Sequence, residues 1–313
     1  MPAFPPGYRI GHRTLRRERT GCTVILPPAG TIAAVDVRGG APGTRETGVF
    51  VPGNLVSEIH GLLFTGGSAF GLAAAAGVAA WLRREGAGFP VGPSRVPIVP
   101  AAVLFDLAVG DADAFPGEAD GWAACEAARE GEIETGSVGA GCGATVGKVL
   151  GVARSSPGGV GCAALELPGG ERVAALSVVN AFGDVVDPDT GARIAGAAPE
   201  NPAFRAAQAL WRDGLPSDPA PGGHTTLLCI ATTVPFEPGS LKRVAMEAHD
   251  GIARAVRPSH SVVDGDVVFA LAPSGPAPAV PMRLRIGAAA AEAAARAIVD
   301  AVAGPSRGAG ASL

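Results

Sequence analysis

Short apolar runs of strand length occur along the whole chain, and helical segments lie between some of them without a regular order. The clearest helical segments are residues 66–86, which open on glycines and a serine, and the Ala-rich residues 287–302. Segments expected to form strands are residues 21–26, 31–37, 61–65, 160–167, 171–180, 225–233 and 266–271. A doubly wound parallel sheet needs strands and helices in regular alternation. The irregular order therefore predicts the α+β class.

The first two strand segments are separated by four residues, Pro-Pro-Ala-Gly, which are typical of a turn. We expect residues 21–26 and 31–37 to form a strand pair across this turn. The small residues of segment 66–86 predict a helix that packs closely against a sheet. No repeat of fixed period is present, and we expect residues 1–313 to form one domain.

The composition supports a folded, soluble chain. Glycine and proline are frequent, with 46 and 28 of 313 residues, but 47% of residues are hydrophobic and only 17% are charged. Such a chain can bury enough apolar surface to offset the entropy lost on ordering. The formal net charge of −4 offers no basic footprint for nucleic acid or anionic lipid. We therefore expect neither a nucleic-acid partner nor a membrane partner.

The cysteines and the first residues of the sequence indicate in which cellular compartment the protein is expected. The five cysteines are widely spaced and form no C-x-x-C pair, so a disulfide framework or a zinc knuckle is not expected. Residues 1–20 contain no continuous apolar stretch of the kind found in secretory signals, and no apolar run reaches membrane-spanning length uninterrupted. We expect a cytoplasmic protein.

A glycine-rich segment, residues 136–147, precedes Lys148. It misses the phosphate-binding P-loop pattern at two positions and lacks the acidic residue that a dinucleotide fold places about 20 residues further on. It is either a tight backbone turn or a loop that presents amide groups and Lys148 to a reacting centre. Only two of the 25 basic residues are lysines, Lys148 and Lys242, and arginine cannot replace a titratable amine.

A loop rich in proline and glycine, residues 213–224, runs directly into Thr225 and an apolar strand. Threonine is common in strands, so this position can be purely structural. It is also where N-terminal-nucleophile hydrolases carry their catalytic hydroxyl. Attack of that hydroxyl on the preceding carbonyl, followed by hydrolysis, frees an α-amine with a pKa near 8, which can act as a general base.

Two further positions are candidates for a reactive site. Asp264-Gly265-Asp266 can form a simple turn, coordinate a metal or orient a base. Asn180 ends the run ALSVVN and is either a turn residue or a neutral donor to an oxyanion. The five histidines show no H-x-x-x-H spacing, and we expect no metal and no cofactor.

Together these segments resemble the L-aminopeptidase/D-esterase, or β-aminopeptidase, family of self-processing N-terminal-nucleophile hydrolases, which includes nylon-oligomer hydrolases. The similarity extends over nearly the whole chain and is most distinctive in VDVRGGAPGTRET (35–47), LLFTGGSAFGLAAAAGV (62–78), GFPVGPSRVPIVPAAVLFDL (88–107), GSVGAGCGATVGK (136–148), VVNAFGDVVDPDTG (178–191), HTTLLCIATT (224–233) and DGDVVFAL (264–271). The resemblance implies a four-layer αββα sandwich, a hydrolase acting on small amides or peptides, and a homotetramer.

The resemblance also implies a role for each matching residue. Thr225 matches the nucleophile, and Asn180 matches the residue that holds the oxyanion. Lys148 matches the lysine of the nylon-hydrolase branch, while Gly147 aligns with the tyrosine of the aminopeptidase branch. Asp264 and Asp266 match the acidic pair that positions the nucleophile and its amine.

The chain departs from its threonine-nucleophile relatives at one position, since those relatives carry asparagine where His224 stands. Self-cleavage between His224 and Thr225 would give chains 1–224 and 225–313. The attack uses the carbonyl of His224, so we expect cleavage to survive, slowed or made pH-dependent by an imidazole that titrates near neutrality. Two alternatives remain open, an acyltransferase on a related fold and an uncleaved binding or scaffold protein.

Overall fold

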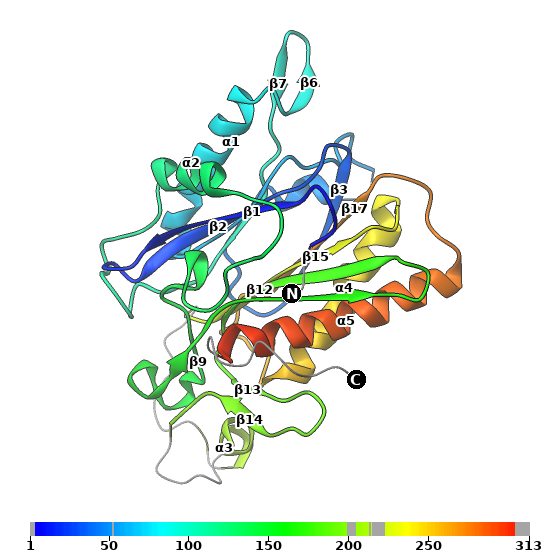
Figure 1. The fold of residues 1–313 in the computed structure, drawn as a ribbon. Helices are drawn as coiled ribbons and strands as arrows, with labels where there is room; N and C mark the ends of the chain where they lie inside the picture. Colours follow the sequence, from blue (N-terminus) through cyan, green and yellow to red (C-terminus); the bar gives the residue numbers. More distant parts are fainter. Residues whose placement is uncertain (1–3, 52, 199–204, 213, 215–222, 304–313) are drawn as a thin grey trace.

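The computed structural model describes residues 4–51, 53–198, 205–212, 214 and 223–303. Two five-stranded sheets face each other (Figure 1). The first sheet has the order β1 (Arg9–Leu15), β2 (Thr20–Leu26), β5 (Leu62–Thr65), β8 (Ala101–Val103) and β4 (Thr44–Arg45). The second has the order β11 (Gly159–Glu166), β12 (Arg172–Asn180), β15 (Thr225–Thr232), β17 (Val267–Pro273) and β3 (Thr31–Val37).

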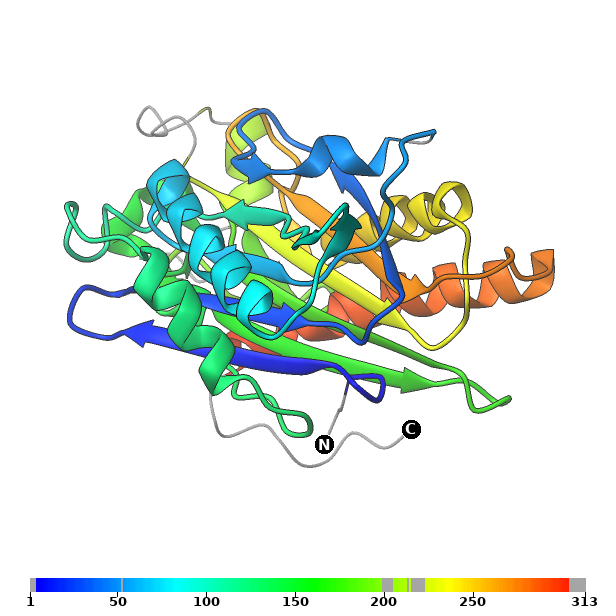
Figure 2. The ribbon, with the colours of Figure 1, turned by 90° about the horizontal axis from the view of Figure 1, so that it is seen from above.

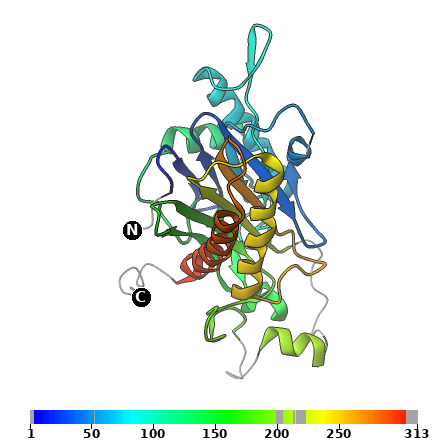
Figure 3. The same ribbon diagram turned by 90° about the vertical axis from the view of Figure 1, so that its right-hand side faces the viewer.

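Two pairs of helices cover the outer faces of the sheets. Helices α1 (Ala74–Arg84) and α2 (Glu118–Ala127) lie across the first sheet (Figure 2), and α4 (Pro238–Ala255) and α5 (Val280–Val302) cover the second sheet (Figure 3). Separate apolar cores fill the space under each helix pair and the space between the sheets. This arrangement is the four-layer αββα sandwich, and it confirms the α+β class and the architecture expected from the sequence.

The central strand β15 shows why the sequence folds in this way. All eight of its residues are buried, and its side chains alternate between two cores. Leu227 and Cys229 face the first sheet, whereas Leu228 and Ile230 face α4 and α5. A strand covered on both sides needs a continuous apolar run, and TTLLCIAT provides one.

The expected pairing of residues 21–26 with residues 31–37 is wrong. Strand β2 pairs with β1 and β5 in the first sheet, while β3 pairs with β17 in the second. The turn between them carries the chain from one layer to the other. Ile25 and Ala33 nevertheless lie in the same core, because each strand points its alternate side chains into the space between the sheets.

Several helices begin at other residues than the sequence suggests. Segment 66–86 starts with a 3₁₀ turn, Ser68–Ala73, before α1. Helix α5 begins seven residues before residue 287, because Pro281 lies in its first turn, where a missing N–H costs nothing. The sequence also predicts a helix over residues 201–211; helix α3 (Ala206–Arg212) covers the second half of this range, and the first residues of the range lie outside the described part of the chain.

Glycines allow α1 to pack closely, as expected from its small residues. A Cβ atom at Gly77 would lie 1.8 Å from the Glu118 carbonyl oxygen, and one at Gly121 would lie 1.9 Å from that of Ala74. These positions therefore fix the contact between α1 and α2. Ala74, Ala75 and Val78 complete the packing against the first sheet.

The remaining short elements lie beside the sandwich. They are β6 (Phe89–Val91) with β7 (Ser94–Val96), β9 (Thr145–Val146) with β10 (Ser156–Pro157), and β13 (Asp184–Val186) with β14 (Arg193–Ala195) and β16 (Val256–Arg257). Strands β13 and β14 and helix α3 lie together at one end of the molecule (Figure 1). Among the described residues, no helix is both long and apolar enough to cross a membrane.

Candidate active site

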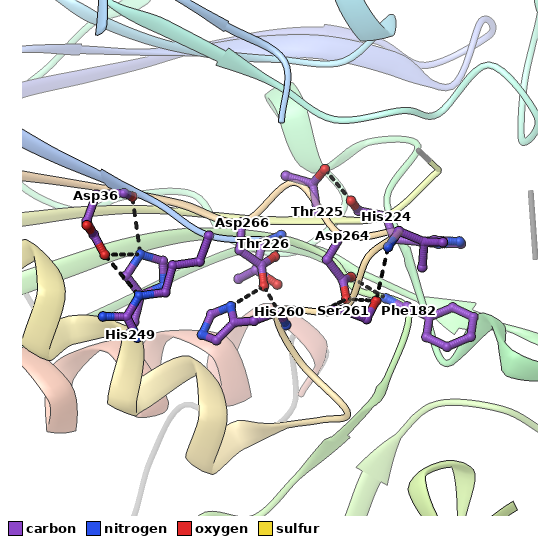
Figure 4. A network of polar contacts seen from close by, with 12 residues as sticks. Asp36, Phe182, His224, Thr225, Thr226, His249, His260, Ser261, Asp264 and Asp266 are labelled. Carbon is purple, nitrogen blue, oxygen red and sulfur yellow. Dashed lines mark hydrogen bonds and ion pairs between the residues drawn. The ribbon is translucent and has the colours of Figure 1, made fainter. Parts of the chain in front are cut away.

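The predicted site residues meet where adjacent strands of the second sheet begin or end. Asn180 is the last residue of β12 and is the register partner of Thr225, the first residue of β15. His224 forms a parallel bridge with Asp264, just before β17 begins (Figure 4). Residues far apart in the sequence are therefore brought to one edge by strand pairing.

Lys148 reaches this edge from the glycine-rich segment. Gly147 before it has a φ of 74°, and a Cβ there would lie 2.0 Å from the Ala197 nitrogen, so this position requires glycine. The Lys148 Nζ atom is buried and donates to the Asn180 side-chain oxygen at 2.7 Å, the Asn180 carbonyl at 3.0 Å and the Gly223 carbonyl at 3.0 Å. Burial lowers the pKa of Lys148 to about 7, although the Asp264 and Asp106 carboxylates oppose this shift.

The amide of Asn180 has partners on both of its ends. Its Oδ1 atom accepts hydrogen bonds from Lys148 and from the Thr145 N–H. Its Nδ2 atom donates to the Phe105 carbonyl at 3.1 Å and the Gly223 carbonyl at 3.3 Å. Two donors of the site, from Lys148 and Asn180, therefore point at one carbonyl oxygen, that of Gly223.

The Thr225 hydroxyl lies next to the peptide bond that precedes it. It donates to the His224 carbonyl oxygen at 2.5 Å, and the Gly265 N–H donates to the same oxygen at 2.8 Å (Figure 4). A Cβ at Gly265 would lie 3.0 Å from the Thr225 Oγ1 atom and 2.5 Å from the Ala41 carbonyl oxygen. Glycine is therefore needed for this close approach.

The two carboxylates of the acidic pair hold neighbouring backbone groups. Asp266 accepts from the Thr226 N–H at 2.7 Å, and Asp264 accepts from the Phe182 N–H at 3.4 Å. Burial, and next the charge of Asp266, raise the pKa of Asp264, while hydrogen bonds from Ser261 and Phe182 oppose the rise. Asp266 thus holds the backbone directly after Thr225, and Asp264 holds the backbone of Phe182, two residues after the end of β12.

The environment of His224 corrects one expectation. Its ring packs against Phe182 with 4.9 Å between centroids, and both ring nitrogens are buried with no hydrogen-bond partner among the described residues. Burial, assisted by the charge of Lys148, lowers the pKa of His224 to about 3. The expectation that this imidazole titrates near neutrality is therefore wrong, since desolvation keeps it uncharged.

Three residues near the site were not foreseen from the sequence. Ser261 donates to Asp264 from its backbone and its hydroxyl, and His260 does the same for Asp266 from its backbone and its ring. Asp106 is buried and accepts a hydrogen bond from the Gly67 N–H at 2.7 Å. Its charge acts to raise the pKa of Lys148. In the sequence, Asp106 could have been recognised as the single charged residue within the apolar run AAVLFDL.

The described residues contain no cluster of three or more histidine, cysteine or carboxylate side chains able to hold a metal ion. The arrangement places a threonine hydroxyl beside a carbonyl, with backbone and side-chain donors nearby. Such a constellation supports acyl transfer.

Comparison with known proteins identifies relatives of this chain. An uncharacterized aminopeptidase of Mycobacterium tuberculosis is 42% identical over 95% of this chain and 91% of its own length. A 6-aminohexanoate-oligomer endohydrolase of Agromyces is 33% identical over 85% of this chain and 73% of its own.

The fold is similar to that of the L-aminopeptidase D-Ala-esterase/amidase from Ochrobactrum anthropi, a variant of the Ntn hydrolase fold. The TM-score is 0.73 at 20% identity, with 96% of this chain and 87% of that chain covered. A Burkholderia β-aminopeptidase gives a TM-score of 0.70 at 24% identity, over 95% of this chain and 84% of its own. The family model for peptidase family S58 matches residues 6–312, and the chain therefore belongs to that family of hydrolases.

Proposed function

We propose that the chain is a self-processing amidohydrolase whose nucleophile is Thr225. The observation that carries this proposal is the position of the Thr225 hydroxyl, 2.5 Å from the His224 carbonyl oxygen, which also accepts the Gly265 N–H. The hydroxyl lies beside the bond to be cut, and a backbone donor already lies where negative charge would develop.

The processing reaction needs no reagent besides water. The Thr225 Oγ atom adds to the carbonyl carbon of His224, and the Gly265 N–H stabilises the oxygen that becomes negative. The C–N bond then breaks, the nitrogen takes up the proton lost by the hydroxyl, and an ester links His224 to Thr225. Water hydrolyses this ester to the His224 carboxylate, the Thr225 hydroxyl and a free Thr225 α-amine.

In the processed enzyme, the freed amine accepts the proton of the Thr225 hydroxyl as it attacks a substrate amide. Asn180 and Lys148 donate to the substrate oxyanion. Both point at the Gly223 carbonyl in the intact chain, and withdrawal of that carbonyl after cleavage frees them. When it is protonated, Lys148 lowers the pKa values of the nucleophile and its amine, and Asp264 and Asp266 orient the first residues of β15.

We further propose that the substrates are small amides, short peptides or amide oligomers. Support comes from the names of the relatives, which include an aminopeptidase and a 6-aminohexanoate-oligomer endohydrolase. The acyl group of such a substrate passes to Thr225 and then to water.

A cytoplasmic homotetramer is the proposed assembly. All five cysteines are free and buried, which suits a reducing compartment. Phe70 and Phe115 stack with their centroids 5.2 Å apart while 61% and 41% exposed, and exposed aromatic pairs are typical of surfaces that bind another chain.

Mass spectrometry of the purified protein tests the proposal. Processing predicts two species of about 22 and about 9 kDa, the shares of residues 1–224 and 225–313 in a 30.9 kDa chain. Thr225→Val should remain at 30.9 kDa and hydrolyse no amino-acid amide, whereas the neighbouring control Thr226→Val should be processed. Retained cleavage in Thr225→Val refutes the nucleophile, and an intact, inactive wild type favours a binding protein. Products formed only with an added amine acceptor favour an acyltransferase.

A further inference from the structure

His260 is held in an unusual backbone conformation beside the acidic pair. Its φ is 54°, in the left-handed region that few residues with a bulky side chain adopt. This conformation lets both its backbone N–H and its Nδ1–H reach one carboxylate oxygen, Oδ2 of Asp266, at 3.1 and 2.7 Å (Figure 4). Strained conformations persist where several interactions hold them, as two do here.

The other oxygen of the same carboxylate holds the strand that carries the proposed nucleophile. Asp266 Oδ1 accepts from the Thr226 N–H at 2.7 Å, and Thr226 follows Thr225 directly. The Asp266 side chain is 2% exposed, so water does not share its hydrogen bonds to any great extent. A continuous set of contacts therefore runs from the His260 ring to the backbone beside Thr225.

A second histidine, His249, packs against the ring of His260. The His249 ring contacts the His260 ring edge to face, with 4.8 Å between centroids, and its Nε2 atom lies 3.2 Å from the Asp36 carbonyl oxygen. Burial lowers the pKa of His249 to about 4, so its ring is uncharged near neutrality. The His260 Nε2 atom is buried without a hydrogen-bond partner among the described residues. The polar contacts of the ring are thus directed at Asp266.

We propose that His260 is a positioning residue that fixes the Asp266 carboxylate and, through it, the start of β15. This inference rests on the proposed function, because it concerns the geometry needed for attack by Thr225. His260 itself touches neither the Thr225 hydroxyl nor the His224 carbonyl. His260 holds Asp266 in the orientation in which it accepts the Thr226 N–H. That hydrogen bond in turn keeps the preceding residue, Thr225, beside the bond to be cut.

Four variants separate the ring's donor from its other properties. His260→Gly keeps the left-handed backbone and removes the ring, whereas His260→Leu keeps apolar bulk without a donor. His260→Asn places Nδ2 as many bonds from the backbone as Nδ1 and tolerates a positive φ. Arg19→Gly is the matched control, because exposed Arg19 has the same φ of 54° in the turn between β1 and β2 of the first sheet.

The first measurement is the first-order rate constant for conversion of the freshly translated 30.9 kDa chain into its two fragments. The second is the melting temperature of each variant, measured in the uncleaved Thr225→Val background. We expect the rate to fall at least tenfold in His260→Gly and His260→Leu, and to stay within threefold of wild type in His260→Asn and Arg19→Gly. A merely structural role would make the rate follow the melting temperature, without specific rescue by asparagine.

The failures of the two proposals are distinguishable. If His260→Gly and His260→Leu cleave at the wild-type rate, or if His260→Asn is as slow as they are, the role of the His260 donor is overturned. If Thr225→Val is itself cleaved, the proposed function fails whatever the His260 variants do.

Discussion

The Lys148 side-chain nitrogen lies 2.7 Å from the side-chain oxygen of Asn180 and, together with the Thr145 N–H at 2.9 Å, sets which way that amide faces. A backbone N–H only donates, so the atom that both groups contact must be the amide oxygen. The amide nitrogen is then directed at the carbonyls of Phe105 and Gly223. The buried amine of Lys148 and the Thr145 N–H thus fix Asn180 as a hydrogen-bond donor close to the position where the chain is expected to be cut.

Replacement of Asn180 by alanine should separate the two reactions of the proposed enzyme. Turnover loses the Nδ2 donor to the substrate oxyanion, and we expect kcat/KM to fall by about 100- to 1,000-fold. Self-cleavage uses the Gly265 N–H on the His224 carbonyl and should slow much less. The cleavage time course and the hydrolysis of an amino-acid amide give the two rates.

The control for that experiment is Asn54→Ala, which removes an exposed asparagine whose Nδ2 atom donates to Gly48. It should leave both rates unchanged. Equal losses of cleavage and turnover in Asn180→Ala would show that Asn180 acts in both reactions or supports the site as a whole.

Lys148 should make stability depend on pH. Its folded pKa is about 7 and its ordinary value is 10.5, so between these values the unfolded chain binds a proton that the folded chain lacks. The free energy of unfolding then rises with pH by up to about 1.4 kcal/mol per unit between these values, and this gain is lost again as pH falls from 10.5 to 7. Urea unfolding of wild type and Lys148→Met between pH 7 and 9, both in the Thr225→Val background, measures the difference.

In that comparison, the stability of wild type relative to Lys148→Met should increase with pH. Subtraction removes the contributions of groups common to both chains, such as the buried cysteines whose thiol pKa values are raised. A difference that stays flat over this range would mean that Lys148 is charged throughout.

Gly265→Ala should slow self-cleavage strongly. The new Cβ would lie 2.5 Å from the Ala41 carbonyl oxygen and 3.0 Å from Thr225 Oγ1, so the Gly265 N–H and the hydroxyl cannot both keep their places. Overpacking of this kind typically costs about 1–3 kcal/mol of stability. Gly48→Ala, where a Cβ meets nothing within 4 Å, is the matched control. The cleavage rate and the urea midpoint are measured for both variants, and unchanged cleavage in Gly265→Ala would exclude this N–H from the reaction.

His224→Phe should leave cleavage intact. The reaction uses the carbonyl of residue 224, and the imidazole leaves two buried nitrogens without partners among the described residues. An apolar ring removes that cost, about 1–3 kcal/mol for each unsatisfied group, and retains the contact with Phe182. Since the pKa of His224 is about 3, the wild-type cleavage rate should show no titration of this group between pH 6 and 8. A large drop in the His224→Phe rate, followed by mass spectrometry, would assign the ring a chemical role.

The sequence predicted the elements that depend on local pattern. Strands β12, β15 and β17 appear as apolar runs because they are covered on both faces. The sequence also singled out Asn180 and Thr225 as candidates, and the structure places them at the end of β12 and the start of β15. Asn180 and Thr225 are polar residues at the boundaries of apolar runs, and such boundaries can be recognised in a single sequence.

What the sequence did not predict depends on contacts between distant segments. The pattern of β2 and β3 is the same whether they pair or lie in facing sheets, because both arrangements bury alternate side chains. The pKa of His224 is set by Phe182 and Lys148, which only the fold brings to it. Ser261 and His260 are ordinary loop residues until backbone geometry turns them towards Asp264 and Asp266.

The strand order has a consequence for the two chains that cleavage would produce. Chain 225–313 contributes β15 and β17, and these lie between β12 and β3 of chain 1–224. The larger product chain thus flanks the strands of the smaller one on both sides within one hydrogen-bonded sheet, so the cut breaks the covalent link while the two chains stay paired. Unfolding of the processed protein then separates two chains in every protomer, so its melting temperature should depend more steeply on concentration than that of uncleaved Thr225→Val, whose protomer is a single chain.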